Sequence, residues 1–148
     1  MQYKLLVHVR RKDVDSACSL QSRNCPIAWA LKRTTGTLWS VSKSTATRVE
    51  HGAKFGISRP LPMRARLFVH NFDRNNGRAR PFVFFLNVPA KTYHNAIAHR
   101  ARIQKKRRNL ERRRAKWRAT EIAAKGRVSE YEEYRLFGRE DAELARYE

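Results

Sequence analysis

Acidic residues are scarce in this chain, where 13 Asp and Glu stand against 33 Lys and Arg and the formal net charge is +20. Cysteine is scarcer still: Cys18 and Cys25 are too few for a disulfide framework or a structural zinc site. Cys25 precedes a predicted helix, and we expect it to be a buried structural thiol. No apolar run is long enough to span a bilayer, and Met1–Val9 lacks the layout of a signal peptide. These shortages predict a soluble protein of the cytoplasm with no membrane contact.

Motifs that support catalysis are missing as well. The sequence has no Gly-rich phosphate loop and no nucleophile elbow. His94 and His99 are five residues apart, so they do not share a helix face, and no glutamate lies between them. No two of the aspartates suggest a two-metal nuclease site; they are Asp13, Asp15, Asp73 and Asp141. We therefore expect no enzymatic activity, no bound metal and no cofactor.

Cations are most abundant in residues 100–118, RARIQKKRRNLERRRAKWR, where 11 of 19 residues are Lys or Arg and one is Glu. No Gly or Pro lies between Ala90 and Lys125, and nearly every residue of the run favours a helix. The pattern predicts one long helix from about residue 91 to residue 125, ended by Gly126. Like charges repel at i,i+4 spacing along such a helix, and a polyanion relieves that repulsion as counterions are released. Nucleic acid is therefore the expected partner.

The sign of the charge changes along the chain. Residues 1–90 and 91–127 each have a net charge of +12, whereas residues 128–148 have a net charge of −4. The acidic end has two interpretations: it folds back on the basic helix in cis and competes with nucleic acid, or it recruits a host or phage protein in trans. Three parts are predicted: a small α+β domain over 1–90, the long basic helix over 91–126, and an acidic, partly helical tail over 127–148 with a break at Gly138.

Hydrophobic periodicity in the first 90 residues predicts the order β-α-β-β-α-β. Residues 3–9 alternate as a strand does, and Phe68 and Phe72 recur at helical spacing. The order is that of a ferredoxin-like sandwich, and other small α+β folds share it. The predicted strands are 3–9, 37–43, 44–52 and 80–89, the predicted helices are 26–34 and 62–75, and the predicted loops are 10–24 and 54–62.

Three segments of this domain carry a resemblance to a known family. They are CPIAWALKR, LPMRARLFVHNFDRN and RPFVFFL. The chain resembles a small family of phage-encoded proteins with the motifs CP-[IV]-A-x-A-[LI], L-P-x-x-A-x-x-F-[IV]-x-x-F-D and P-F-x-F-x-[LV]. The matching residues are Cys25, Pro26, Ile27, Ala28, Ala30, Leu31, Leu61, Pro62, Ala65, Phe68, Val69, Phe72, Asp73, Pro81, Phe82, Phe84 and Leu86. The resemblance implies a phage or prophage origin, hence a bacterial host cytoplasm, and an α+β fold. It carries over no catalytic residues and does not extend beyond about residue 88.

The basic helix supplies the candidate nucleic-acid contacts. Arg favours phosphates through paired donors and Lys acts as a point charge, so such contacts give affinity and orientation rather than sequence choice. Trp117 either stacks on an exposed base or anchors the helix by apolar contact. The candidates are Arg100, Arg102, Lys105, Lys106, Arg107, Arg108, Arg112, Arg113, Arg114, Lys116, Trp117 and Arg118, with Arg10, Arg11 and Lys12 as lesser candidates.

The same helix has one thin apolar seam, which recurs in steps of seven residues. It consists of Ile103, Leu110, Trp117 and Ala124. A coiled coil needs two apolar rows, so we do not expect the helix to pair with a second copy of itself. One narrow seam with charge around it suits a helix that lies in a groove or docks lightly on its own chain.

These patterns favour a non-catalytic nucleic-acid-binding protein, with DNA and RNA both open. Two alternatives remain at this point. One is a phage-encoded inhibitor or modulator that docks on a host or defence enzyme. The other is a structural RNA-binding component of a ribonucleoprotein assembly, because a long Arg/Lys helix beside a small α+β domain is a composition that such components share.

Overall fold

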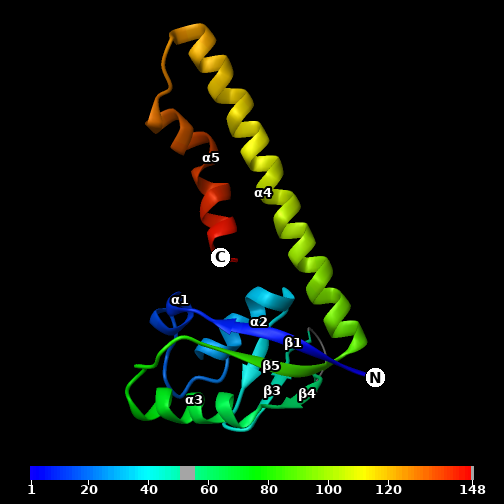
Figure 1. Ribbon diagram of the computed structural model, residues 1–148. Coiled ribbons are helices and arrows are strands. Elements are labelled where there is room, and N and C mark those ends of the chain that lie inside the picture. Colours follow the sequence, from blue (N-terminus) through cyan, green and yellow to red (C-terminus); the bar gives the residue numbers. More distant parts are fainter. Residues whose placement is uncertain (51–55, 148) are drawn as a thin grey trace. The chain divides into compact units, whose positions relative to one another are not determined.

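The computed structural model describes residues 1–50 and 56–147 and confirms the α+β class (Figure 1). The chain divides into two compact units, Met1–Ile97 and Ala98–Glu148, hereafter unit 1 and unit 2. The long helix α4 (Ala90–Lys125) begins in unit 1 and supplies one of the two helices of unit 2. His51 and the rest of residues 51–55 lie outside the described residues.

Unit 1 is built on the pairing of its first and last strands. β1 (Gln2–Val9) runs antiparallel to β5 (Phe82–Pro89), with Leu5 opposite Leu86 and Val7 opposite Phe84. Successive side chains of a strand point to opposite faces, so these apolar residues enter the core together, and all four are buried. The alternation read from the sequence therefore predicts the buried face of this sheet correctly.

A second sheet contains β2 (Trp39–Val41), β3 (Thr45–Arg48) and β4 (Ser58–Pro60) in antiparallel order. Of the small α+β folds that share the predicted element order, the ferredoxin-like sandwich is not the one observed, because the described strands form a two-stranded and a three-stranded sheet. β4 was also missed: its segment reads as a loop, yet Pro60 pairs opposite Thr45. Proline cannot donate to a ladder, so it is tolerated on an edge strand of this kind.

The helices of unit 1 begin and end where their terminal residues dictate. The Cys25 thiol caps α2 (Pro26–Thr35) by accepting a hydrogen bond from the Ala28 amide at 3.3 Å, and Gly36 ends it at φ 73°. α3 (Met63–Arg74) follows Pro62 as predicted. Helix α1 (Arg11–Asp15) lies in a predicted loop, where the Asp13 carboxylate accepts from the Arg10 amide at 2.8 Å and closes a turn.

Unit 2 ends in helix α5 (Glu130–Ala145), which begins at the capping Ser129. The predicted break at Gly138 is wrong, since α5 continues through it. The Tyr134 ring lies over Gly138, within 2.9 Å of the position a Cβ would occupy, so the missing side chain leaves room for that ring. At the other end of the connection, Gly126 has φ 69° and ends α4 as its sequence position predicts.

Cys25 yields a test of this packing. Burial raises its pKa from 9.0 to about 11, and only the thiolate is a nucleophile. We expect a disulfide-exchange reagent at pH 8 to label the exposed Cys18 rapidly and Cys25 only after denaturation. A folded state that holds this proton more tightly also loses stability as the pH rises above 9.0.

The matched variant Cys18→Ser should show no rapid labelling in the folded state. Two rapidly reacting thiols in the unmodified protein would contradict the buried position of Cys25.

Candidate nucleic-acid interface

Helix α5 packs along the apolar seam of α4. Leu110, Phe137 and Leu144 are buried against one another, with Ile103 and Trp117 packed at the edges of the cluster. The rings of Trp117 and Phe137 meet edge to face with centroids 5.9 Å apart. Residues 103, 110 and 117 of α4 and 137 and 144 of α5 are spaced by seven, so each row turns toward the other helix. Three residues of the seam are therefore covered from within the same chain, whereas Ala124 is exposed.

Ion pairs between the two helices flank this apolar contact. The Glu133 carboxylate accepts hydrogen bonds from the Arg118 guanidinium at 2.6 and 2.9 Å, and Arg114 forms a second ion pair with it at 3.1 Å. These arginines lower the pKa of Glu133, chiefly through the Arg118 hydrogen bonds. The same carboxylate raises the pKa of Arg118. One acidic side chain of α5 thus forms ion pairs with two neighbouring cations of α4.

Further pairs continue toward the end of α5. Arg113 donates to Glu140 at 2.6 Å, Arg114 also pairs with Asp141, and Lys106 approaches Glu143 at 3.3 Å. Near the other end, Lys125 contacts Glu121 of its own helix at 2.9 Å and Glu132 of α5 at 3.5 Å. Exposed pairs contribute little individually, but their order along both helices fixes how α5 lies on α4. The tail therefore folds back on the basic helix in cis, while the competition with nucleic acid that this interpretation also contains stays a prediction.

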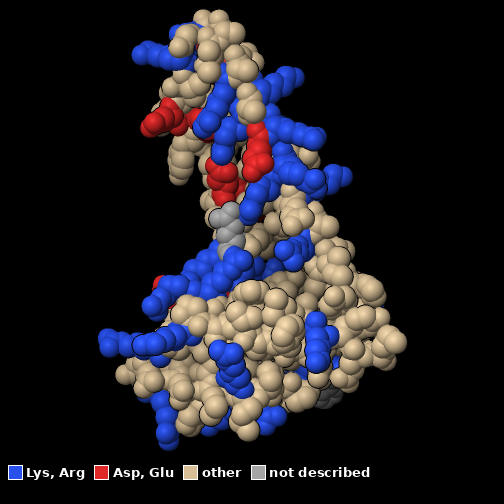
Figure 2. Space-filling view, viewed as in Figure 1, with Lys and Arg blue, Asp and Glu red and all other residues tan. Residues whose placement is uncertain are grey.

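A set of four cations lies on the side of α4 away from α5, and we call it the cationic stripe: Lys105, Arg108, Arg112 and Lys116. Their spacing of three, four and four residues places them on one helix face, roughly opposite Leu110. All four are exposed, and none forms an ion pair with an acidic residue in the part of the chain that the structure describes. Eleven residues of helix correspond to about 16 Å. Figure 2 shows Lys and Arg projecting along α4 on the side away from the acidic residues of α5.

The structure thus separates the sequence-predicted contacts into two groups. Lys106, Arg113, Arg114, Trp117 and Arg118 turn toward α5, where carboxylates or Phe137 hold them. The cationic stripe turns away from it.

The remaining candidates fall into neither group. Arg100 is exposed, Arg102 approaches the His99 ring at 3.5 Å, and Arg107 is half-buried and has a partner. The lesser candidates all belong to unit 1; Arg10 and Lys12 have partners there, and Arg11 is exposed.

Sequence reasoning did not name the acidic partners on α5. The signal was present, because Phe137 and Leu144 repeat the seven-residue step of the α4 seam and carboxylates stand on either side of them. Matching the apolar row of α4 with the apolar row of α5 across a turn at Gly126 would have predicted the helical hairpin.

No family model, no curated protein and no solved structure matches this chain. Over residues 1–50 and 56–147, no helix is both long enough and apolar enough to cross a membrane. Within the same residues no group of three or more His, Cys, Asp or Glu side chains is placed to hold a metal ion.

Leu110 provides a test of the hairpin. It is 3% exposed, and truncation to Ala should cost about 2–5 kcal/mol of packing between α4 and α5. A two-helix unit holds little stability in reserve, so we expect the α5 amides of Leu110→Ala to exchange hydrogen much faster. Asn109→Ala, a change at an exposed neighbour, is the control. Unchanged exchange in Leu110→Ala would contradict the packing.

The lowered pKa of Glu133 predicts that the stability of the α4–α5 hairpin depends on pH. Its folded pKa is lowered below the ordinary 4.5, so its ion pairs stabilise the hairpin above about pH 4.5 and are lost as the pH falls through the lowered value. We expect α5 to lose hydrogen-exchange protection over that range, after correction for intrinsic rates. Glu133→Gln should flatten the dependence and Glu130→Gln, at an exposed position, should leave it unchanged. Identical profiles for the two variants would count against the Glu133 pairs.

Proposed function

We propose that this chain is a non-catalytic nucleic-acid-binding protein that contacts phosphates through the cationic stripe of α4. The observation that carries the proposal is that the two sides of α4 differ in their contacts. One side is packed and neutralised by α5, while Lys105, Arg108, Arg112 and Lys116 stand exposed on the other without an acidic partner in the described residues.

Net charge supports a polyanion as the partner. Residues 98–148 contain 16 Lys and Arg and 9 Asp and Glu, so unit 2 keeps a charge of +7 even with its own acidic helix in place. Binding a phosphate backbone releases the counterions held near that backbone, and this entropy gain favours nucleic acid over an isolated anion. Contacts of this kind fix position without reading base sequence.

The stripe also fits a phosphate backbone in its geometry. Its four cations follow one line along about 16 Å of a rigid helix, with side chains long enough to adjust to neighbouring phosphates. Because α5 covers the other side, nucleic acid binds the stripe without displacing α5. The ion pairs at Glu133 then play a structural part, since they help to align α5 on α4.

A second candidate function has its own observation. On α5, Tyr131, Tyr134 and Leu136 are 76%, 75% and 48% exposed. Exposed aromatic residues are enriched at protein interfaces, which favours a phage-encoded inhibitor or modulator that docks on a host or defence enzyme. Tight binding to such an enzyme after nuclease treatment, lost in Tyr131→Ala/Tyr134→Ala, would favour this function over the first.

The proposed function is tested by removing the stripe. The variant Lys105→Ala/Arg108→Ala/Arg112→Ala/Lys116→Ala keeps helix propensity and removes four charges. Each phosphate contact contributes about 0.9 to the slope of log affinity against log salt for duplex DNA and about 0.7 for single strands. We expect the slope to flatten by about 3 and the affinity to fall steeply in low salt, measured by fluorescence anisotropy on nuclease-treated protein.

The matched control removes four exposed cations elsewhere, in Lys4→Ala/Arg23→Ala/Lys43→Ala/Lys91→Ala. Duplex DNA, single-stranded DNA and structured RNA serve as probes, and their ranking chooses between DNA and RNA. Equal losses in the two variants would show a nonspecific charge effect, and no binding by the unmodified chain would overturn the proposal.

A further inference from the structure

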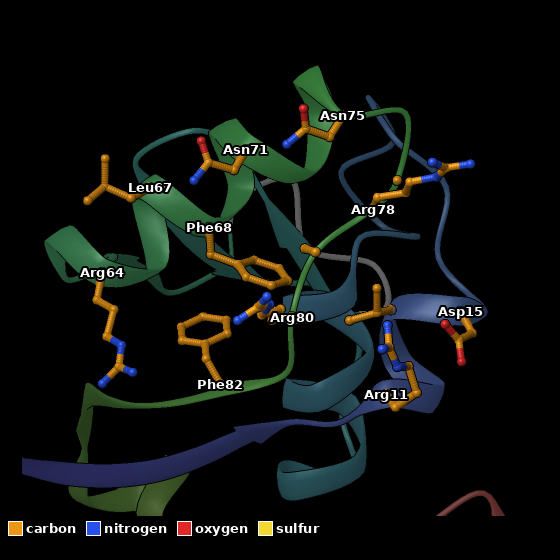
Figure 3. Close-up of a pocket in the computed structure, with 13 residues that line it drawn as sticks. Arg11, Asp15, Arg64, Leu67, Phe68, Asn71, Asn75, Arg78, Arg80 and Phe82 are labelled. Carbon is orange, nitrogen blue, oxygen red and sulfur yellow. The ribbon is translucent and has the colours of Figure 1, made fainter.

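Unit 1 contains an open groove of about 700 Å³ that lies outside the α4–α5 hairpin. It is bordered by α1, by one face of α3 and by the segment that leads into β5 (Figure 3). Among the side chains that line it are four arginines, Arg11, Arg64, Arg78 and Arg80. We call this the basic groove.

The four arginines are exposed, and none has an ion pair with any residue that the structure describes. The one acidic residue in the lining is Asp15. Two arginines elsewhere in unit 1 do have acidic partners, since Arg33 pairs with Asp13 and Arg48 pairs with Glu50. Four cations gathered beside a single carboxylate leave an excess of positive charge, so an anionic ligand would stabilise the groove.

The floor of the basic groove is aromatic. The rings of Phe68 and Phe82 stack with centroids 4.4 Å apart, and Phe82 is only half-buried. Leu67 stands beside them and is 55% exposed. An apolar surface between cations is the arrangement on which nucleic-acid bases stack while phosphates reach the positive rim.

Three of the four arginines lie to the two sides of this floor. In Figure 3 Arg64 lies on one side of the two rings, and Arg78 and Arg11 lie on the other. A single phosphate would meet only one side, whereas a strand crossing the rings would meet cations before and after the base. Asn71 of α3 and Asn75, the residue that caps the end of α3, also line the groove, and their amide groups can donate to and accept from base edges.

We propose that the basic groove binds a single-stranded segment of nucleic acid, with phosphates on its arginines and a base against Phe82. Bases of a duplex are stacked on each other and cannot reach a ring at the bottom of a groove, so the aromatic floor selects unpaired strands. This inference rests on the proposed function for its class of partner, but it assigns a second surface, made of other residues, and a strand type that the stripe does not specify.

The experiment compares Arg64→Ala/Arg78→Ala with the control Arg23→Ala/Lys43→Ala in the full chain. Both remove two exposed cations of unit 1, and only the first touches the groove. The probes are a fluorescent single-stranded oligonucleotide, in DNA and RNA forms, and the corresponding duplex. Two lost single-strand contacts should weaken binding of the single strand about 25-fold at 0.1 M salt, and the control should change it far less.

Stacking is tested without altering the protein. An oligonucleotide with abasic sites has the same charge and no bases, so a groove that stacks a base should bind it at least about fivefold more weakly. Phe82→Leu should reduce the difference in affinity between the normal and the abasic oligonucleotide. Thermal unfolding is measured in parallel to confirm that the variant folds. If Phe82→Leu fails to fold, the abasic comparison on the unmodified chain still decides the point.

The outcomes separate the two proposals. If the duplex binds through the stripe while the groove variant and its control behave alike on single strands, the groove proposal fails and the proposed function stands. If the stripe variant changes nothing while the groove variant loses affinity for single strands, the groove proposal stands and the stripe is not the binding surface. Equal affinity for the abasic and normal strands would overturn base stacking, and no binding of any probe would overturn both proposals.

Discussion

Repulsion between like charges along α4 is the constraint on which the rest of unit 2 depends. Residues 100–118 hold eleven cations and one Glu, and such a helix is unfavourable on its own because neighbours at i,i+4 spacing repel. The chain relieves part of this repulsion internally, since Glu133, Glu140 and Asp141 pair with cations on one side of α4. The cations of the stripe on the opposite side have no acidic partner among the described residues. We propose that an external polyanion relieves their repulsion, so that one side of the helix serves folding and the other serves binding.

Apolar contact holds the hairpin together, and the ion pairs set its alignment. Exposed ion pairs contribute only tenths of a kcal/mol to about 1 kcal/mol each, whereas burying a Leu or Phe side chain contributes about 1.5–3 kcal/mol. Leu110, Phe137 and Leu144 therefore carry most of the stability. Carboxylates at intervals along α5 determine which turn of α4 lies against each turn of α5. A nucleic acid that competed for the paired cations would have to overcome both the apolar contact and the ion pairs between α4 and α5. The unpaired stripe is therefore the easier site to bind.

Local patterns in the sequence predicted the features that depend on local physics. The span of α4, its end at Gly126 and the buried face of β1 follow from propensity, capping and alternation. Features that depend on distant residues were missed. The two separate sheets follow from pairings such as Thr45 with Pro60, and the basic groove gathers arginines from positions 11 to 80. Gly138 was misread because the Tyr134 ring that covers it is visible only in three dimensions.

The measurement that tests the central claim most directly is hydrogen exchange of the α5 amides with nucleic acid bound at saturation. If the two sides of α4 have separate roles, protection of α5 should be unchanged or increased when nucleic acid occupies the stripe. Loss of that protection on binding would show that nucleic acid displaces α5 to reach Arg113, Arg114 and Arg118. The acidic helix would then be a competitor for the binding site, and the division of α4 into two faces would be contradicted.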